Sequence, residues 1–318
     1  MGKGIALAFA YAGYPVVLMD SEAHADAEFD QLKDASKSEL ASELAFLHDI
    51  NVITDAQRAS ISQRISIISH SQAEQELAQA DFVFEAVLEL MEIKQKVYTW
   101  LSDYSSDDAI ISSTTSTMSA NDLAAFVQGK ARFVNAHWLN PAHLMPLVEV
   151  SPGDHTSPQT VETMRSLLET IGKVPVVCKA SPGFIVSRIQ AVALNEATRV
   201  VEEGVASAED VDKAIKAGFG IRYATLGLLE FVDWGGGDIL YHATNYLGKN
   251  LDEHRFSVAD IVKDNMANNR NGLRDGIGFY DWQDIDIEAY RREKMTDFVR
   301  LLQHRELMPK LEVADDKQ

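Results

Sequence analysis

The sequence predicts an α/β protein in which a doubly wound domain is followed by an all-helical C-terminal domain. Three observations support this prediction. Strand-like and helix-like segments alternate over the first half of the 318-residue chain. The strand-like runs are apolar throughout, as in strands that are buried on both faces of a parallel sheet. After Ser181 the strand signals stop, and only helical patterns remain.

The elements of the first half follow from apolar periodicity and from residues that start helices. Ser119 with Asp122 three positions later predicts a capping box, and Pro158 suits the first position of a helix. The expected helices are 4–12, 21–47, 71–79, 91–103, 119–127 and the segment opened by Ser157-Pro158. The expected strands are PVVLMD (15–20), RISIIS (64–69), DFVFEAV (81–87), DAIISS (108–113), RFVNAH (132–137), PLVEV (146–150) and VPVVCK (174–179).

The second half predicts helices only. The stretch 183–204 is helical and ends at Gly204, and Ser207 with Asp210 caps the next helix. Further helices are expected at 226–233, 236–247 and 256–267. We place a boundary near Ala180, which gives a domain 1–180, a helical domain 181–287 and a tail 288–318. The tail should be a peripheral helix that ends in a loose EVADDKQ segment.

Composition excludes several classes of protein. The net charge of −19 argues against nucleic acid and anionic membrane as partners. No run approaches the ~18–20 apolar residues of a membrane span, and no secretory signal is visible. The single cysteine, Cys178, rules out a disulfide framework and multi-cysteine metal sites, and it is expected to be a buried strand residue. A reducing cytoplasm is the simplest compartment.

The chain opens MGKGIALAFAYAGYPVVLMD. In a dinucleotide-binding unit, three glycines follow the first strand, and an acidic residue about 20 positions on binds the ribose. Gly2 suits the third glycine, and Asp20 ends a strand 18 residues later. A plain α/β packing unit would contain the same residues, so the pattern leaves both interpretations open. No arginine follows Asp20 to meet a 2′-phosphate, so a site here would prefer NAD to NADP.

The strand that should precede these glycines is absent, and it would be central in a doubly wound Rossmann sheet. Without it, PVVLMD lacks its inner neighbour, and backbone groups face a gap. We therefore hypothesise that the natural protein starts roughly a dozen residues earlier and that Met1 is an internal methionine.

Three further segments carry a more specific signal. They are FEAVLELMEIK, with Glu85, Glu89 and Lys94, the run IISSTTSTMSANDLA, and RFVNAHWLNPAHLMPLVEV. Together with SPGFIVSRI and NGLRDGIGFYDW, they resemble the 3-hydroxyacyl-CoA dehydrogenase family. The resemblance runs from Met1 to about Trp282 and implies a Rossmann domain, a helical domain that forms a homodimer interface, and NAD as cofactor.

The resemblance also implies roles for individual residues. His137, in the position of an H-x-x-N-P motif, matches the catalytic histidine, and Glu149 matches its partner glutamate. Ser116 falls where the family keeps a serine that hydrogen-bonds the substrate oxygen. Cofactor contacts are implied for Gly2, Asp20, Glu89 and Lys94. The active site would lie in a cleft between the domains, with Asn140 and Arg222 near the substrate.

These residue types suit the oxidation of a secondary alcohol. A histidine titrates near neutrality, so it can take the hydroxyl proton and return it. A carboxylate fixes the tautomer of that histidine, and a serine hydroxyl donates to the carbonyl oxygen. Taken alone, His137 would more often be a satisfied core histidine; Glu85 is expected to cap a turn, and Trp138 to serve in packing. We expect no metal site, because His137 and His143 have no nearby partners.

Two positions depart from the family pattern. Ser187 stands where the family normally has an asparagine that contacts the substrate carbonyl. We still expect Ser187 to be one of the catalytic residues. Arg222 replaces a proline, and its guanidinium suits either a substrate carboxylate or a surface salt bridge. The expected function is an NAD-dependent dehydrogenase of a short-chain 3-hydroxyacyl-CoA. The alternatives are a dehydrogenase of a free hydroxy-carboxylate (of gulonate, carnitine or pyridine-carboxylate type) and a catalytically decayed structural homologue.

Overall fold

The computed structural model describes residues 1–309. The chain divides into two compact units, Met1–Leu194 and Asn195–Gln318, and each is described by itself. The division falls within helix α8 (Val186–Glu202), which begins six residues after the boundary predicted near Ala180.

The first unit contains two sheets. Strands β1 (Val16–Met19) and β2 (Ile65–Ile68) form a parallel pair. A second sheet has the order β3-β4-β5-β6-β7. Its strands are β3 (Phe82–Glu85), β4 (Ile110–Ser113), β5 (Phe133–Trp138), β6 (Leu147–Pro152) and β7 (Val174–Val177). Within the described chain, β1 is hydrogen-bonded to β2 alone.

One strand runs against the prediction of a wholly parallel sheet. Strand β6 is antiparallel to β5, while the other paired strands are parallel. Only residues 139–146 connect β5 to β6, and such a connection is too short for the crossover that a parallel pair needs. The reversal matters for the site, because it sets His137 and Glu149 opposite each other.

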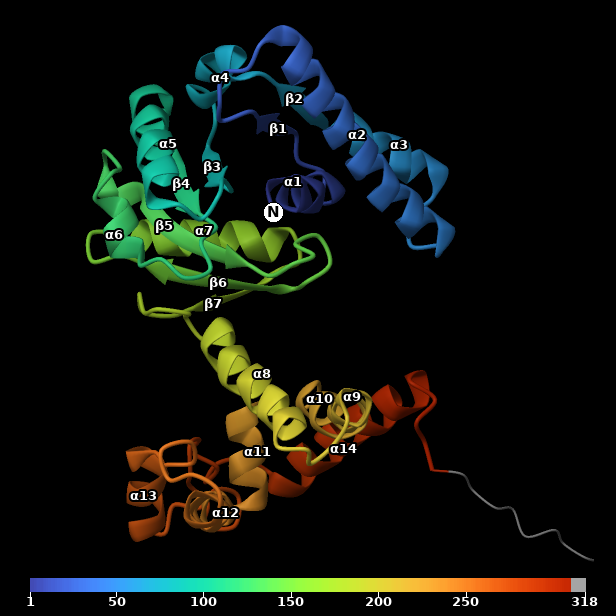
Figure 1. The fold of residues 1–318 in the computed structure, drawn as a ribbon, viewed down its shortest axis with the longest axis vertical. Coiled ribbons are helices and arrows are strands. Elements are labelled where there is room, and N and C mark those ends of the chain that lie inside the picture. The colour runs from blue at the N-terminus through green and yellow to red at the C-terminus, as the bar shows by residue number, and fades with distance from the viewer. Residues whose placement is uncertain (310–318) are drawn as a thin grey trace, which may run out of the picture. The chain divides into compact units, whose positions relative to one another are not determined.

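Helices cover both faces of the five-stranded sheet (Figure 1). Helices α1 and α7 pack on the face formed by Ile110, Val134 and Val148, and α5 and α6 on the face formed by Ile111 and Phe133. The helices of this unit are α1 (Gly2–Tyr11), α2 (Asp26–Asp49), α3 (Asp55–Gln63), α4 (His70–Leu77), α5 (Met91–Tyr104), α6 (Ala120–Ala124) and α7 (Pro158–Thr170), with a 3₁₀ turn η1 at Lys130–Arg132. The doubly wound prediction is confirmed.

Local details differ from the sequence prediction. Residues 21–25 lie outside α2, and the prediction missed α3, which Thr54 opens in a capping box with Gln57. Ser119 does cap α6, but its hydroxyl accepts from the amide of Asn121, so the expected box with Asp122 is wrong. Cys178 follows β7 and is half-buried, not buried.

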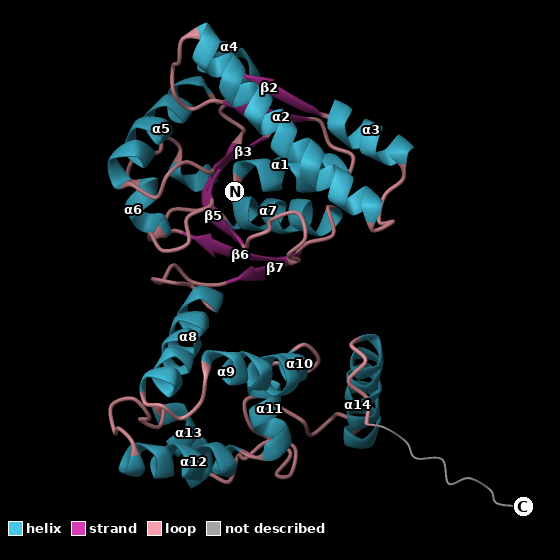
Figure 2. Cartoon of the chain, turned by 45° about the vertical axis from the view of Figure 1, so that its right-hand side comes forward, coloured by secondary structure: helices cyan, strands magenta, loops and turns pink. Residues whose placement is uncertain are grey.

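The second unit is helical, and Figure 2 shows strands in the first unit only. Its elements are the remainder of α8, α9 (Ala208–Ala214), a π-helical turn η2 (Ile215–Phe219), α10 (Gly220–Tyr223), α11 (Leu228–Gly235), α12 (Gly237–Asn250), α13 (Asp260–Ala267) and α14 (Ile287–His304). Ser207 caps α9 through the amide of Asp210, as predicted. In residues 1–309, no helix is long and apolar enough to cross a membrane.

A buried carboxylate organises the NGLRDGIGFYDW segment of this unit. Asp233 is 2% exposed and accepts from the amides of Phe279 and Tyr280 and from Trp282 Nε1, each at 2.9 Å. Trp282 in turn packs on Tyr290, which attaches α14 to the unit. The tail therefore begins as a helix, as expected, whereas EVADDKQ lies outside the described residues.

Candidate active site

His137 and Glu149 are cross-strand neighbours. They face each other in the register of the antiparallel β5–β6 ladder, so both side chains project from the same face. The imidazole Nδ1 lies 2.7 Å from Glu149 Oε2. Both residues are buried, with His137 3% exposed and Glu149 fully covered. The pair that the sequence predicted is thus brought together by sheet register.

The other oxygen of Glu149 binds the start of α8. Oε1 accepts from the amides of Ile185, at 2.8 Å, and Val186, at 3.0 Å. Amides at the start of a helix have no intrahelical partner, and they favour negative charge. One oxygen of this carboxylate therefore accepts hydrogen bonds from amides at the start of α8, and the other contacts the imidazole.

Ser116 faces the second nitrogen of the imidazole. Its Oγ lies 3.1 Å from His137 Nε2. Because a carboxylate only accepts hydrogen bonds, Glu149 fixes the imidazole proton on Nδ1 and leaves a lone pair on Nε2. Nε2 therefore faces the hydroxyl of Ser116, which is an exposed residue.

A strained turn holds one face of the imidazole. Gly183 and Phe184 both have positive φ angles, +73° and +47°, and the second is uncommon for a bulky residue. The turn places the buried Phe184 ring 5.5 Å from the His137 ring, centre to centre. In the sequence, this segment stands out only as part of the SPGFIVSRI motif. The strain supports a positional role for the turn.

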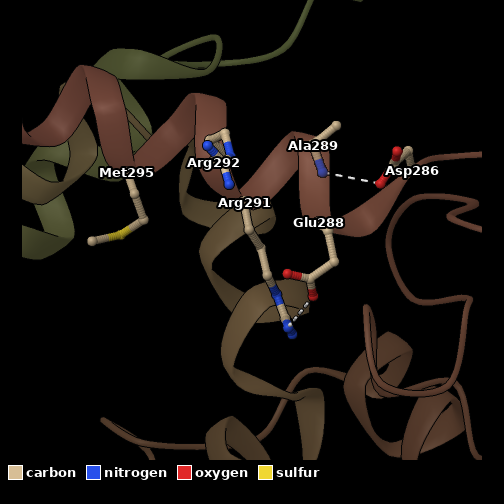
Figure 3. A pocket seen from close by; sticks show the side chains of 6 residues that line it. All are labelled: Asp286, Glu288, Ala289, Arg291, Arg292 and Met295. Carbon is tan, nitrogen blue, oxygen red and sulfur yellow. Dashed lines mark hydrogen bonds and ion pairs between the residues drawn. The ribbon is translucent and has the colours of Figure 1, made fainter.

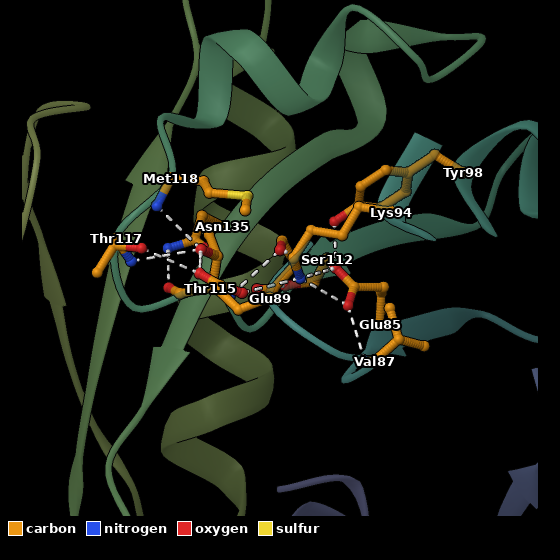
Figure 4. A network of polar contacts seen from close by, with 11 residues as sticks. Glu85, Val87, Glu89, Lys94, Tyr98, Ser112, Thr115, Thr117, Met118 and Asn135 are labelled. Carbon is orange, nitrogen blue, oxygen red and sulfur yellow. Dashed lines mark hydrogen bonds and ion pairs between the residues drawn. The ribbon is translucent and has the colours of Figure 1, made fainter. Parts of the chain in front are cut away.

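A buried polar network lies beside this site (Figure 4). Lys94 is 1% exposed, and its Nζ donates to both oxygens of Glu85, at 2.8 and 2.9 Å. Glu85 also accepts from Val87 N–H, Ser113 Oγ and Tyr98 OH. Burial first, and then the charge of Glu85, raise the pKa of Tyr98 well above its usual value. Glu85 does cap the turn after β3, as expected, whereas its buried ion pair with Lys94 has no local sequence signature.

Glu89 connects this network to the turn that carries Ser116. Its Oε2 lies 3.2 Å from Lys94 Nζ, and its Oε1 accepts from the hydroxyls of Thr115 and Thr117. Burial disfavours the charged form of Glu89, but the Thr115 hydrogen bond and the Lys94 charge outweigh it and lower the pKa of this carboxyl. Lys94 and Glu89 are therefore partners of each other.

The residues predicted to bind the adenosine end lie around β1. Asp20 follows β1, and its side chain is 17% exposed. It accepts from the amide of Glu22 and lies 2.8 Å from His24 Nδ1. Gly2 begins α1, where a Cβ would stand 3.4 Å from that of Ala86. Gly4 is the tighter position, because a Cβ there would approach Ala142 to 3.2 Å.

Three predicted residues remain less defined. Ser187 lies in the first turn of α8 and is half-buried, and Asn140 is exposed at the cis peptide bond before Pro141. Arg222 belongs to the second unit, where its guanidinium lies 4.8 Å from the centre of the Phe231 ring. Trp138 packs in the core against Phe9 and Phe84. The roles of Ser187, Asn140 and Arg222 stay predictions.

Other features do not form a competing site. A surface hollow on α14 is lined by none of the predicted site residues (Figure 3). The lining residues are Asp286, Glu288, Ala289, Arg291, Arg292 and Met295. Arg291 pairs with Glu288 at 3.5 Å, so these charges satisfy one another. Within residues 1–309, no cluster of three or more His, Cys, Asp or Glu residues could hold a metal ion.

Comparison with known families gives matches along most of the chain. Residues 1–181 match the NAD-binding domain of 3-hydroxyacyl-CoA dehydrogenase, and residues 183–282 match the C-terminal domain of the same enzyme. These two domains together cover the whole candidate site in β4, β5, β6 and α8.

The relatives differ from one another in the substrate that their names give. The chain is 35% identical to 5-formyl-3-hydroxy-2-methylpyridine 4-carboxylate 5-dehydrogenase of Mesorhizobium japonicum over 71% of this chain and 74% of that one. It is 29% identical to 3-hydroxybutyryl-CoA dehydrogenase of Clostridioides difficile over 89% and 96%. A solved 3-hydroxyacyl-CoA dehydrogenase of Archaeoglobus fulgidus has a TM-score of 0.75 at 29% identity, covering 97% of this chain and 96% of that one.

Proposed function

The chain belongs to the 3-hydroxyacyl-CoA dehydrogenase family, and we propose that it interconverts a short-chain 3-hydroxyacyl-CoA and its 3-oxo form. It is an NAD-dependent oxidoreductase, as both family matches and relatives of this name support. The finer proposal assigns His137 as the base and Glu149 as its partner. The observation that carries it is the contact of one imidazole with a buried carboxylate on Nδ1 and with a serine hydroxyl on Nε2.

The described residues fit the cofactor. The N-terminus of α1 has no side-chain cap among them, so its amides remain for a pyrophosphate, and Asp20 is partly exposed for ribose hydroxyls. Glu89, 40% exposed at its side chain, would meet the nicotinamide end, with Lys94 behind it. NAD, when bound, accepts the hydride that leaves the substrate carbon.

His137 provides the acid–base step. In the oxidation direction, its Nε2 accepts the proton of the substrate hydroxyl, and in the reduction direction it returns that proton. Glu149 Oε2 accepts from Nδ1–H throughout, so it holds the ring in place and stabilises the imidazolium that forms. The amides of Ile185 and Val186 fix the carboxylate itself.

Ser116 shares the substrate oxygen with the imidazole. Its hydroxyl lies next to Nε2, the atom that the substrate oxygen must also approach. From there it can donate a hydrogen bond to the developing carbonyl oxygen. We propose that Ser187, from the first turn of α8, and Asn140 supply further polar contacts to the substrate. A serine is shorter than asparagine, so Ser187 reaches the carbonyl less far than the family residue does.

A free carboxylate is the second candidate substrate. The 35% identity to the pyridine-carboxylate dehydrogenase favours it, and a solved structure of a dehydrogenase of that acid has a TM-score of 0.66 at 29% identity. We propose that Arg222 would then bind the carboxylate through its guanidinium. A catalytically decayed homologue is the remaining alternative.

A substrate panel separates these functions. The purified chain is assayed for NADH formation with 3-hydroxybutyryl-CoA, longer 3-hydroxyacyl-CoA thioesters and free hydroxy-carboxylates, and in reverse with acetoacetyl-CoA. The proposal predicts the highest kcat/KM with the short thioester. Higher kcat/KM with a free acid, abolished in Arg222→Leu, would establish the second candidate. No turnover with any substrate, despite NAD binding, would indicate the decayed homologue.

We also propose that the protein is a cytoplasmic homodimer. Large apolar side chains are exposed on α8, where Val192 is 70% and Leu194 66% exposed, and on α12, where Ile239 is 62% exposed. Exposed apolar patches of this kind mark association surfaces. Light scattering coupled to size-exclusion chromatography should give twice the mass of 35.2 kDa. A mass of one chain at micromolar concentration would contradict the dimer.

A further inference from the structure

The hydroxyl of Thr115 is the junction between two parts of the candidate site. Thr115 is 1% exposed, and its Oγ1 donates to Glu89 Oε1. The same oxygen accepts from the amides of Thr117, at 3.3 Å, and Met118, at 3.0 Å. One buried hydroxyl therefore ties a carboxylate on the segment after β3 to the turn after β4 (Figure 4).

This turn is also fixed through its backbone. The amide of Thr115 donates to Ser113 Oγ, and Ser113 donates to Glu85 Oε2 at 2.9 Å. The carbonyl of Thr115 accepts from Asn135 Nδ2 at 3.4 Å. The backbone of Thr115 is thus anchored to two neighbouring strands, β4 and β5, before its side chain is considered.

Ser116 is the next residue, and it projects from the anchored turn. Its hydroxyl reaches His137 Nε2, although Ser116 itself is exposed and has no other hydrogen bond within residues 1–309. The position of this hydroxyl therefore depends on the bonds of its neighbours. One of these is the charge-assisted bond from Thr115 to Glu89.

We propose that Thr115 is a positioning residue that couples the cofactor-side carboxylate Glu89 to the substrate-side hydroxyl Ser116. Its hydroxyl bonds Glu89 directly and, through the amides of Thr117 and Met118, holds the turn that carries Ser116. The proposal rests on the proposed function for the roles of Glu89 and Ser116. Its geometric basis, the bonds of Oγ1 to Glu89 and to the two amides, is independent of that function.

The side chain at position 115 must both donate a hydrogen bond to Glu89 and accept hydrogen bonds from two amides. Valine has the shape of threonine but neither donates nor accepts, so it would leave Glu89 Oε1 with Thr117 alone and the amides of Thr117 and Met118 unpaired. Serine keeps the hydroxyl and loses only a methyl group. The pair Thr115→Val and Thr115→Ser therefore separates the hydroxyl from the packing of the side chain.

The kinetic test compares Thr115→Val, Thr115→Ser and the control Thr99→Val in the full chain. Thr99 lies on the exposed side of α5, where its hydroxyl bonds the Gln95 carbonyl. Thr115→Val should lower kcat about tenfold or more, because misplaced groups lose rate steeply, with a smaller change in KM for the thioester. Thr115→Ser should return kcat to within about threefold of the original, and Thr99→Val should leave it unchanged.

The pH profile gives a second readout that general loosening would not move. Lys94 faces Glu89 from α5, and Glu85 and the Tyr98 hydroxyl lie beyond Lys94. Loss of the Thr115 bond removes one cause of the lowered pKa of Glu89. The acidic limb of kcat/KM for NAD should then move to higher pH in Thr115→Val and return in Thr115→Ser.

Crystal structures of the original protein and of Thr115→Val test the positioning directly, without turnover. We expect the distance from Ser116 Oγ to His137 Nε2 to be about 1 Å or more longer in the variant than in the original protein. A folded Thr115→Val protein that keeps this contact, or keeps kcat within about threefold with an unmoved acidic limb, would overturn the proposal. If the original protein turns over no substrate, the proposed function fails, and the two structures still decide the role of Thr115. If Thr115→Val does not fold, Thr115→Ser provides the test. A Thr115→Ser protein that keeps the Ser116–His137 contact but has a reduced kcat would contradict the proposed role of the hydroxyl.

Discussion

Glu149 stands directly opposite His137 in the β5–β6 ladder and joins its imidazole to the first turn of α8. Because the two strands are antiparallel, the pair does not depend on long or mobile side chains. The carboxylate has two different sets of donors, one on each oxygen. A substitution at Glu149 can therefore change the bond of one oxygen and keep that of the other.

Replacement of Glu149 by glutamine should separate its two tasks. The amide oxygen of glutamine can still accept from Ile185 and Val186, but its NH₂ group would then face His137 Nδ1 and force the proton onto Nε2. We expect kcat to fall about a thousandfold or more with little loss of stability. Glu149→Ala should lose stability as well, because the helix amides are left unpaired. Steady-state kinetics and urea denaturation check both expectations, and a Glu149→Gln kcat within tenfold of the original contradicts them.

The left-handed turn before α8 predicts a cost for a single methyl group. Gly183 has a φ of +73°, so Gly183→Ala should destabilise the protein by about 1–2 kcal/mol. The shifted amides of Ile185 and Val186 should also lower kcat. Gly218→Ala is the matched control, since Gly218 is helical, with open space around its Cβ position, and alanine is favoured there. Equal effects of the two changes in urea denaturation would remove the argument for a strained turn.

The contact of His24 with Asp20 predicts a pH dependence of stability. The hydrogen bond to Asp20 raises the pKa of His24 above 6.5, against a smaller opposing effect of burial. A raised pKa in the folded state stabilises the protein below pH 6.5 and ceases to do so as the pH rises through the folded value. Asp20→Asn should therefore lower stability more at acidic than at alkaline pH.

Urea denaturation at several pH values, with Asp26→Asn as a control of equal charge change, measures this difference. Asp26 is exposed in the first turn of α2 and has no hydrogen bond or ion pair within residues 1–309. An NMR titration should also place the pKa of His24 lower in Asp20→Asn than in the original protein. A His24 titration that does not change in the variant would contradict the assignment.

The stability of the second unit should depend strongly on the buried side chain of Asp233. Asp233→Ala leaves the amides of Phe279 and Tyr280 and the indole N–H of Trp282 without their acceptor. Each orphaned donor costs about 1–3 kcal/mol, so the loss should be about 3 kcal/mol or more. Asp284→Ala, at an exposed position nearby, should have almost no effect. Denaturation followed by tryptophan fluorescence checks the pair, and similar midpoints would refute the role of Asp233.

The architecture and the proximity of His137 to Glu149 could both be predicted from the sequence. Apolar strands alternating with amphipathic helices predicted the doubly wound unit, because burial on both faces leaves this signature. The resemblance of the segment RFVNAHWLNPAHLMPLVEV to the family indicated His137 and Glu149. The spacing of these two residues implies the short connection that reverses β6. The same spacing could have predicted the antiparallel strand.

Other features depend on contacts that no local pattern records. The pairing of Glu85 with Lys94 joins residues on β3 and α5, and the bond of Thr115 to Glu89 joins residues 26 positions apart. Neither contact has a periodic or capping signature. The packing of Phe184 on His137 requires left-handed backbone at a phenylalanine, which local preferences oppose. Features of this kind are set by the assembled sheet.

The most direct test of the central claim is the kcat of His137→Gln together with its affinity for NAD. The glutamine keeps polar contacts with Glu149 and Ser116 but cannot take up the hydroxyl proton. We expect a kcat at least a hundredfold lower, a dissociation constant for NAD within about threefold of the original, and an unchanged kcat in the exposed control His155→Gln. A His137→Gln enzyme that binds NAD normally and loses less than about tenfold in kcat would contradict the role of His137 as the base.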